Sequence, residues 1–425
     1  MVPGGHTPAQ PPRVRNLPFV TVTRRAGLNV ATRRADTHRV TPPERPRTRL
    51  EALLAYAVRR GASDVHLKVP AKPMLRIDGR LTPIDDHPPL SRADTEAFAA
   101  EVLTAAASPA KDAEFHEMGD VDLSHACNGV GRFRVNIFRQ RGSVSLVLRV
   151  VPFSVRSLEE LHLPPAVGQL AGEERGIILV TGTTGSGKST TLAAMIDMIN
   201  RTAYKHVVTI EDPIEMLHND RKSVVNQREV GLDTQSFMGA LRRVLRQDPD
   251  VIMIGEIRDH TTMEVALSAA ETGHLVMSTM HTLNATETIN RAIGFYPLHQ
   301  QMQVRAMLAG TLRGIISQRL VPRADGPGRV AACEILITTG RAKDMITTPE
   351  DTGRISEVIR DGEYYGMQTF DQSLFQLHEA GHISYEDALR NADSVNDLRL
   401  RIKLEGHEAQ GRNMLAGLEH LDIVK

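Results

Sequence analysis

The chain has 425 residues, of which 41% are hydrophobic and 24% are charged, an ordinary globular composition with enough length for two or three domains. Its 51 Lys and Arg residues balance its 51 Asp and Glu residues, so the net charge gives no reason to expect nucleic acid as a partner. With no apolar run near about 18 residues, no secretory signal and only Cys127 and Cys333, the chain is expected to be cytoplasmic, without membrane insertion or a disulfide scaffold.

Residues 1–49 carry ten Arg against two acidic residues, many Pro and no sustained helical or strand periodicity. Such a segment cannot bury enough apolar surface to offset the entropy lost on ordering, so we predict a disordered tail. A basic docking arm is the functional alternative. A start codon assigned too far upstream would also produce this stretch.

Residues 50–152 are predicted to form a compact α+β domain. Apolar residues recur at helical spacing from Leu50. The Asp-Gly pair at 78–79 stands between two apolar runs, which is typical of a two-residue hairpin. Apolar and polar residues then alternate over 133–137 and 144–150, which predicts an antiparallel sheet.

Prolines at 152, 164 and 165 indicate a linker over 153–174 that contains one short helix at most. Short apolar strands then alternate with helical stretches over 175–338, which predicts an α/β fold with a parallel sheet covered on both faces. These strands are predicted at 176–181, 206–211, 250–256 and 274–281. Residues 339–425 are predicted to be a mainly helical C-terminal region, with helices at 368–380 and 384–404.

The segment GTTGSGKST follows the first of these strands and precedes a helical stretch, as a phosphate-binding loop (P-loop) requires. Its glycines permit a close backbone approach, and its N–H groups and the helix N-terminus face an anion. Lys188 is expected to reach the β and γ phosphates, and the Ser189 hydroxyl to ligate Mg²⁺. The predicted binding residues are Gly182, Thr183, Thr184, Gly185, Ser186, Gly187, Lys188, Ser189 and Thr190. A glycine-rich turn without a ligand is the structural alternative.

A carboxylate, Glu256, follows the strand at 250–256. We expect this strand to lie beside the strand that leads into the P-loop, which would bring Glu256 close to the γ-phosphate, where it could polarise water directly or through the metal. The usual P-loop arrangement has an Asp at the preceding position, where this chain has Gly255. A simple ion pair with Arg258 is the structural alternative for Glu256.

Two other strand ends carry polar groups. The segment TIEDPIE contains Glu211 and Glu215, and acids beside a phosphate site favour metal or water handling, with a solvated acidic turn as the alternative. His281 ends the strand at 274–281, where it could sense the γ-phosphate, while His274 at its start is expected to be architectural.

Charge neutralisation at the transferring phosphoryl group also needs cations, and no arginine immediately flanks the P-loop. Candidates from the first domain are Arg132, Arg134 and Arg139. Such arginines are most often a solvated face, so they become candidates only if the first domain packs over the nucleotide.

The run of motifs ASDVHL, GRFRVN, TGTTGSGKSTTLAAM, TIEDPIE, VNQREVG, ALRRVLRQDPDVIMIGEIRD, ETGHLVMSTMHT and GMQTFDQSL resembles the type IV pilus retraction ATPase family, PilT, of the secretion ATPase superfamily. The resemblance covers about residues 50–395. It implies a PAS-like first domain, a RecA-like ATPase domain with a helical C-terminal cap, and a homo-hexamer that hydrolyses ATP with Mg²⁺ to depolymerise a pilus. It also implies an inner-membrane platform protein as a partner, hence a place at the cytoplasmic face of that membrane.

The resemblance also assigns roles to matching residues. Lys188 and Ser189 correspond to the Walker A pair and Glu256 to an atypical Walker B glutamate. Glu211 and Glu215 fall in an aspartate box, and His274 and His281 in a histidine box. The family places first-domain arginines near the nucleotide, which supports Arg132, Arg134 and Arg139 without choosing among them. Glu211, His281 and these arginines are therefore expected to act in catalysis with Glu256.

Two departures from the family pattern stand out. Thr183 replaces a usual Pro, whose side chain the phosphate cradle does not need. The segment RAKDMITT, 341–348, stands where the family has an A-I-R-N-L-I-R-E signature associated with retraction, and it lacks the second arginine and the glutamate. Three alternatives therefore stay open: a pilus assembly or type II secretion ATPase, an accessory ATP-binding subunit that assembles with an active paralogue, and a RecA-like nucleic-acid translocase, against which the charge balance counts.

Overall fold

The computed structural model describes residues 48–77, 79–151 and 155–406. The predicted disordered tail lies outside these residues, apart from Thr48 and Arg49. Thr48 accepts a hydrogen bond from the amide of Glu51 and so caps the first helix, α1 (Arg49–Arg59). The helix α1 and its cap therefore include the last two residues of the segment that sequence patterning assigned to the tail.

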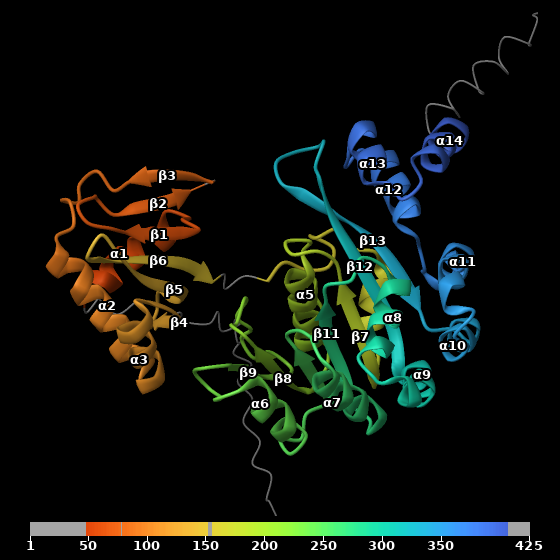
Figure 1. The fold of residues 1–425 in the computed structure, drawn as a ribbon. Coiled ribbons are helices and arrows are strands. Elements are labelled where there is room, and N and C mark those ends of the chain that lie inside the picture. The colour runs from red at the N-terminus through yellow and green to blue at the C-terminus, as the bar shows by residue number, and fades with distance from the viewer. Residues whose placement is uncertain (1–47, 78, 152–154, 407–425) are drawn as a thin grey trace, which may run out of the picture. The chain divides into compact units, whose positions relative to one another are not determined.

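The first domain contains one antiparallel sheet of six strands in the order β3-β2-β1-β6-β5-β4 (Figure 1). Its elements are α1, β1 (Asp64–Leu67), β2 (Met74–Ile77), β3 (Arg80–Pro83), α2 (Arg92–Ala106), α3 (Pro109–Met118), β4 (Asp120–Cys127), β5 (Gly131–Gln140) and β6 (Ser143–Val151). Burial alternates along β5, so that Phe133 and Ile137 enter the core while Arg132 and Arg134 lie on the other face. Ile77 pairs with Arg80 across two residues, as the Asp-Gly signal predicted.

The second domain is built on a sheet of seven strands in the order β13-β12-β7-β11-β10-β8-β9 (Figure 1). The strands are β7 (Gly176–Thr181), β8 (His206–Glu211), β9 (Val224–Glu229), β10 (Val251–Ile254), β11 (Leu275–Met280), β12 (Leu312–Pro322) and β13 (Arg329–Ile337). All neighbouring pairs are parallel except β12 with β13. β7 and β8 begin and end at the residues predicted for them.

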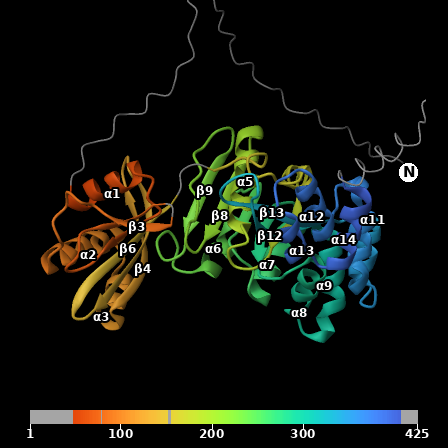
Figure 2. The ribbon, with the colours of Figure 1, turned by 90° about the horizontal axis from the view of Figure 1, so that it is seen from above.

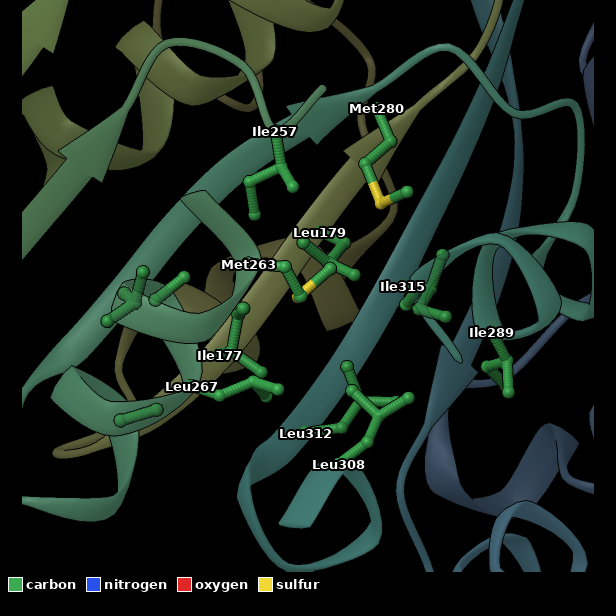
Figure 3. Close-up of a cluster of buried hydrophobic side chains, with 14 of the residues drawn as sticks. Ile177, Leu179, Ile257, Met263, Leu267, Met280, Ile289, Leu308, Leu312 and Ile315 are labelled. Atoms are coloured by element: carbon green, nitrogen blue, oxygen red, sulfur yellow. The ribbon is translucent and has the colours of Figure 1, made fainter. Parts of the chain in front are cut away.

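Helices cover both faces of this sheet, because successive residues of a strand point to opposite sides. Ile177 and Leu179 of β7 belong to one core cluster, which Figure 3 shows around Met263 and Ile315. Ile178 and Val180 belong to the cluster on the opposite face, with residues of α4 and α5. The helices are α4 (Pro165–Ala171), α5 (Lys188–Thr202), α6 (Phe237–Val244), α7 (His260–Glu271), α8 (Ala285–Gly294) and α9 (Leu298–Thr311). The predicted α/β fold is therefore confirmed.

One prediction about this sheet was wrong. β10, which leads to Glu256, is not the neighbour of the P-loop strand β7, because β11 lies between them and pairs with both. Chain order does not determine spatial order in a parallel sheet, since each crossover can skip a position that a later strand fills. The strand that ends at His281 is thus the central link between the P-loop and the acid.

The C-terminal part contains α10 (Gly340–Thr347), η1 (Thr352–Arg354), α11 (Ile355–Asp361), η2 (Glu363–Tyr365), α12 (Phe370–Glu379), α13 (Tyr385–Asn391) and α14 (Val395–Glu405). α12 and α13 pack against β13 and β12, respectively, at that edge of the sheet (Figure 2). The single helix predicted over 384–404 is in fact two, because Ala392 is extended and the Ser394 side chain caps a new helix. Across the described residues, no helix combines the length and apolar character that a bilayer crossing demands.

Candidate nucleotide-binding site

The P-loop lies between the end of β7 and the start of α5, with its three glycines in the left-handed half of backbone space. Gly182, Gly185 and Gly187 have φ of 138°, 80° and 94°. A Cβ at Gly182 would lie 2.5 Å from both the Gln318 carbonyl oxygen and the Ser186 hydroxyl. Only glycine fits there without displacing neighbouring atoms, so the observed conformation of the loop requires glycine at position 182.

Lys188 is the first residue of α5, and its ammonium is turned back onto the loop. Its Nζ donates to the carbonyl oxygens of Gly182, at 2.8 Å, and Thr183, at 3.0 Å. Burial lowers the pKa of Lys188, against the attraction of Glu256 and Glu215, which raises it. The side chain is thus a buried cation held at the mouth of a helix N-terminus, where phosphate oxygens can replace the two carbonyls.

The residues present fit a bound phosphate. Ser186 has a buried hydroxyl that finds no partner among the described residues, which leaves one hydrogen-bonding group of the loop unsatisfied in the empty site. The loop borders a cavity of about 720 Å³, which is within the range of small-ligand sites. Predicted residues that line this cavity are Thr184, Gly185, Gly187, Lys188, Ser189, Thr190, Glu211, Glu215, Glu256, His281 and Arg134. The other three P-loop residues, Gly182, Thr183 and Ser186, shape the loop from behind.

Glu256 enters this cavity from the far side of β11. Backbone hydrogen bonds from Gly255 to Ile210 and from Ile257 to Thr279 fix the segment between β8 and β11. A Cβ at position 255 would stand 3.2 Å from the Ile210 oxygen, a tight contact that a larger residue could occupy only if the neighbouring backbone shifted. The carboxylate that lines the cavity here belongs to the next residue, Glu256.

Two partners hold the Glu256 carboxylate. Oε2 lies 2.7 Å from an Arg258 nitrogen, and Oε1 lies 3.1 Å from His281 Nε2. Burial by itself raises the pKa of Glu256, but hydrogen bonds and charges from Arg258 and His281 outweigh it, so the pKa falls below its ordinary value. The group is therefore ionised at neutral pH and able to accept a proton or orient water. The ion pair with Arg258 is present too, as the structural alternative foresaw.

The two acids of the TIEDPIE segment differ in their surroundings. Glu211 is buried and accepts hydrogen bonds from the Thr209 hydroxyl and the Gln227 amide, and from the backbone of Glu215. Burial raises the pKa of Glu211, while these hydrogen bonds lower it in part. Its oxygens are already engaged, which leaves Glu215 the better placed of the two for a metal-bound water. Their predicted role as metal ligands stays a prediction.

The two histidines lie at opposite ends of β11. His281 follows the strand and reaches Glu256. His274 precedes it, and its Nδ1 lies 3.0 Å from the carbonyl oxygen of Ala269 in α7. His274 thus fixes the turn between α7 and β11, in line with the architectural interpretation. Of these two histidines, only His281 lines the cavity.

The three candidate arginines all lie on β5 or at its end, in different environments. Arg132 donates to Glu229 at 2.8 Å and is therefore engaged in an ion pair. Arg134 is among the residues that line the cavity. Arg139 stands over the Phe115 ring, with its guanidinium 5.1 Å from the ring centroid. Of the three, Arg134 is the best placed for a phosphate, and the catalytic role of each stays a prediction.

Sequence reasoning missed the support that β12 gives to the P-loop. Gln318 presents its carbonyl oxygen to Gly182, and its side-chain amide donates to the Thr191 hydroxyl of α5 at 2.8 Å. Leu320 packs against Gly187. Polar residues inside β12 hide it from an apolar-run search, and Arg329 at the start of β13, which also lines the cavity, carries no motif.

Together, the fold and the site define a P-loop nucleotide-binding protein in which a glutamate and a histidine face the phosphate loop. Residues 45–356 match the family described as Type II/IV secretion system protein. The chain belongs to this family, and within it to the PilT-like retraction ATPases.

The relatives support this assignment. The chain is 43% identical to the type IV pilus ATPase PilU of Pseudomonas aeruginosa over 373 residues, which cover 88% of this chain and 96% of PilU. It is also 43% identical to the type IV pilus retraction ATPase PilT of the same organism over 340 residues, which cover 80% of this chain and 97% of PilT. A crystal structure of the pilus retraction motor PilT with bound ADP is similar with a TM-score of 0.74 and 46% identity, covering 82% of this chain and 98% of that one. The PAS-like character of the first domain and the cap role of the C-terminal helices stay predictions.

Proposed function

We propose that this protein is an ATP-hydrolysing motor that powers retraction of a type IV pilus. The observation that carries the proposal is the convergence of Lys188, Glu256 and His281 on one cavity, in a chain whose relatives include PilT. A loop that only binds nucleotide needs the lysine and the glycine cradle. The added carboxylate and imidazole supply a base and its partner, which hydrolysis requires.

In this proposal each group has a defined task. Lys188 leaves its two carbonyl acceptors and binds the β and γ phosphates of ATP. The Ser189 hydroxyl and the Glu215 carboxylate would hold Mg²⁺, which would neutralise phosphate charge when bound. Glu256, ionised because of Arg258 and His281, orients the attacking water and accepts its proton. Arg134 is the proposed source of additional positive charge at the transferred phosphoryl group.

Work on a pilus also needs an assembly and an attachment. We propose a homo-hexamer that acts at the cytoplasmic face of the inner membrane on a platform protein of the pilus machine. Rigid-body movement of domains is the means by which hydrolysis in such a ring would become mechanical work. These partners and this location rest on the relatives, whose names place them in type IV pilus systems.

A second candidate function is an accessory ATPase that works alongside a separate retraction motor. One observation favours it: the segment 341–348 lacks the second arginine and the glutamate of the retraction-associated signature. In the structure this segment lies mainly in α10, where Met345 and Ile346 are buried and Lys343 is exposed. The positions where the segment lacks the arginine and the glutamate of the signature, 347 and 348, are exposed.

The test combines turnover with a cell phenotype. Purified protein should hydrolyse ATP by itself, and Lys188→Ala should abolish turnover because it removes the phosphate cation. Cells that lack the gene should carry many surface pili but not move on surfaces, and only the wild-type gene should restore motility. Absent pili would indicate an assembly ATPase, and no turnover without a second ATPase would indicate the accessory subunit.

A further inference from the structure

A chain of buried polar side chains runs across three strands of the second sheet, beside the nucleotide cavity. Thr181, the last residue of β7 before the P-loop, donates to the Ser317 hydroxyl on β12 at 3.0 Å. Ser317 pairs in register with Glu334 on β13, which places the two side chains on the same face of the sheet, and Ser317 lowers the pKa of the Glu334 carboxyl. Thr181 and Ser317 are fully buried, and Glu334 is 6% exposed.

The chain ends at a helix N-terminus. Glu334 Oε1 accepts a hydrogen bond of 2.7 Å from the backbone N–H of Ala285, the first residue of α8. This N–H has no acceptor within the helix, so the carboxylate both satisfies it and faces the positive end of the helix dipole. An acid from β13 is thus used as a cap for a helix that it does not belong to.

The capped turn is continuous with the loop that carries His281. Residues 281–284 connect β11 to α8, and they are tied down by hydrogen bonds from the Leu283 amide to Glu287 and between the Thr282 and Thr288 hydroxyls. Ala285 anchors the end of this loop to Glu334. At the other end, Met280 pairs with Thr181 of β7. The loop is therefore fixed at both ends to the strands that also carry the chain of buried polar side chains.

The surroundings of Glu334 show that the carboxylate is held by specific contacts. Two charged residues act on the pKa of Glu334: Asp393 raises it and Arg319 of β12 lowers it. Arg319 and Asp393 also form an ion pair with each other at 2.7 Å. Burial raises the pKa of Glu334 to about 7, and the contact with Ala285 opposes that rise. A buried acid that costs free energy to ionise is retained here, which is typical of a group with a positioning task.

We infer that Glu334 is a positioning residue for hydrolysis, which sets the place of His281 against Glu256 by anchoring the start of α8 and ties that placement to the P-loop strand through Ser317 and Thr181. The inference rests on the proposed ATPase function. Glu334 itself touches no nucleotide: it lies outside the set of residues that line the cavity. Its effect should therefore fall on the rate of the chemical step and leave nucleotide binding nearly unchanged.

A double-mutant cycle between Glu334→Ala and His281→Ala tests this in the ATPase assay. Glu334→Ala should lower kcat about tenfold with KM for ATP changed by less than about threefold, because the loop is displaced while the P-loop lysine stays in place. In the His281→Ala background the same substitution should lower kcat by less than about twofold, because the group it positions is gone. Equal losses in both backgrounds would overturn the inference.

Two further variants separate positioning from general destabilisation. Glu334→Gln keeps an oxygen for the Ala285 N–H and should retain kcat within about threefold of the wild type, even if the alanine variant folds poorly. Asp94→Ala is the matched control: Asp94 accepts from the backbone N–H of Ser91 in the capping box of α2, in the first domain and outside the residues that line the cavity. It should leave kcat unchanged. A Gln variant as slow as the Ala variant would contradict anchoring through the hydrogen bond.

Amide hydrogen exchange of the nucleotide-free protein supplies a readout that does not depend on turnover. Exchange at residues 282–288 should be faster in Glu334→Ala than in the wild type and unchanged in Asp94→Ala. If the wild type hydrolyses ATP and this exchange is unchanged, the inference fails while the proposed function stands. If the wild type lacks turnover, the proposed function fails, and the exchange experiment still decides whether Glu334 anchors the loop.

Discussion

Replacing Glu256 with glutamine removes one negative charge from the nucleotide cavity and preserves the size of the side chain. We expect kcat for ATP hydrolysis to fall by about 10²–10⁴, the usual contribution of a general base. This corresponds to about 3–5 kcal/mol of activation free energy. Nucleotide affinity should be equal or slightly tighter, because a carboxylate in the same cavity as Lys188 would repel the nucleotide phosphates and its removal relieves that repulsion.

The stability cost of the same change is much smaller. The Arg258 side chain that pairs with Glu256 is 77% exposed, and an ion pair with one exposed partner contributes about 0–1 kcal/mol. Glutamine can still accept a hydrogen bond from Arg258 or His281. The variant should therefore unfold within a few degrees of the wild type, so a loss of turnover cannot be assigned to unfolding.

The assay is steady-state phosphate release, with nucleotide affinity measured separately by a fluorescent ATP analogue. Arg258→Gln is the matched control, because it removes the ion pair and leaves the carboxylate. If Glu256 only holds Arg258, the two variants should have similar kcat values. Turnover of Glu256→Gln at the wild-type rate would refute the role of Glu256 as the base.

Three other outcomes are expected. Gly182→Ala should destabilise the nucleotide-free protein by more than about 2 kcal/mol, because its Cβ would meet the Gln318 oxygen at 2.5 Å. Gly185 also has a positive φ but open space around it, so Gly185→Ala should cost about 1–2 kcal/mol. Similar midpoints of the two variants in chemical denaturation would contradict this difference. Phe133→Ala should destabilise the first domain by about 3–5 kcal/mol, since the ring is fully buried, and a midpoint near that of the wild type would show that the core collapses around the loss. The pKa of Glu334 is about 7 in the folded protein and about 4.3 when unfolded. The wild type should therefore lose up to about 3 kcal/mol of unfolding free energy relative to Glu334→Gln as the pH rises from 4 to 8, because the unfolded chain releases the proton more readily. A stability difference that does not change with pH would contradict the raised pKa.

The sequence predicted best where one short pattern determines local geometry. The P-loop spacing located the turn from β7 to α5, and continuous apolar runs gave β7 and β8 their correct bounds. Glu256 was found because it is a charged residue directly after such a run. These signals work because they need only neighbouring residues and a known backbone requirement.

Most errors and omissions concern relations between distant residues, and one, the break at Ala392, is local. The sequence did not show that β11 separates β7 from β10, because a crossover leaves no local trace in the chain. The break at Ala392 was missed because apolar residues continue at helical spacing through it, although Ser394 with Asp397 three residues later is a capping signal. Glu334 and Gln318 were overlooked because an isolated polar residue in a strand is usually exposed, and only their partners explain why they are buried.

The contacts that Lys188 makes with the P-loop backbone have a consequence for the site without nucleotide. In the empty site the ammonium keeps hydrogen-bond partners, because the Gly182 and Thr183 carbonyl oxygens accept hydrogen bonds from it. Loss of a bound phosphate would thus replace contacts to the ligand with contacts inside the loop, and the loop would keep its shape between ligands. Because the two carbonyls compete with phosphate for one ammonium, they lower the affinity of the loop for any nucleotide.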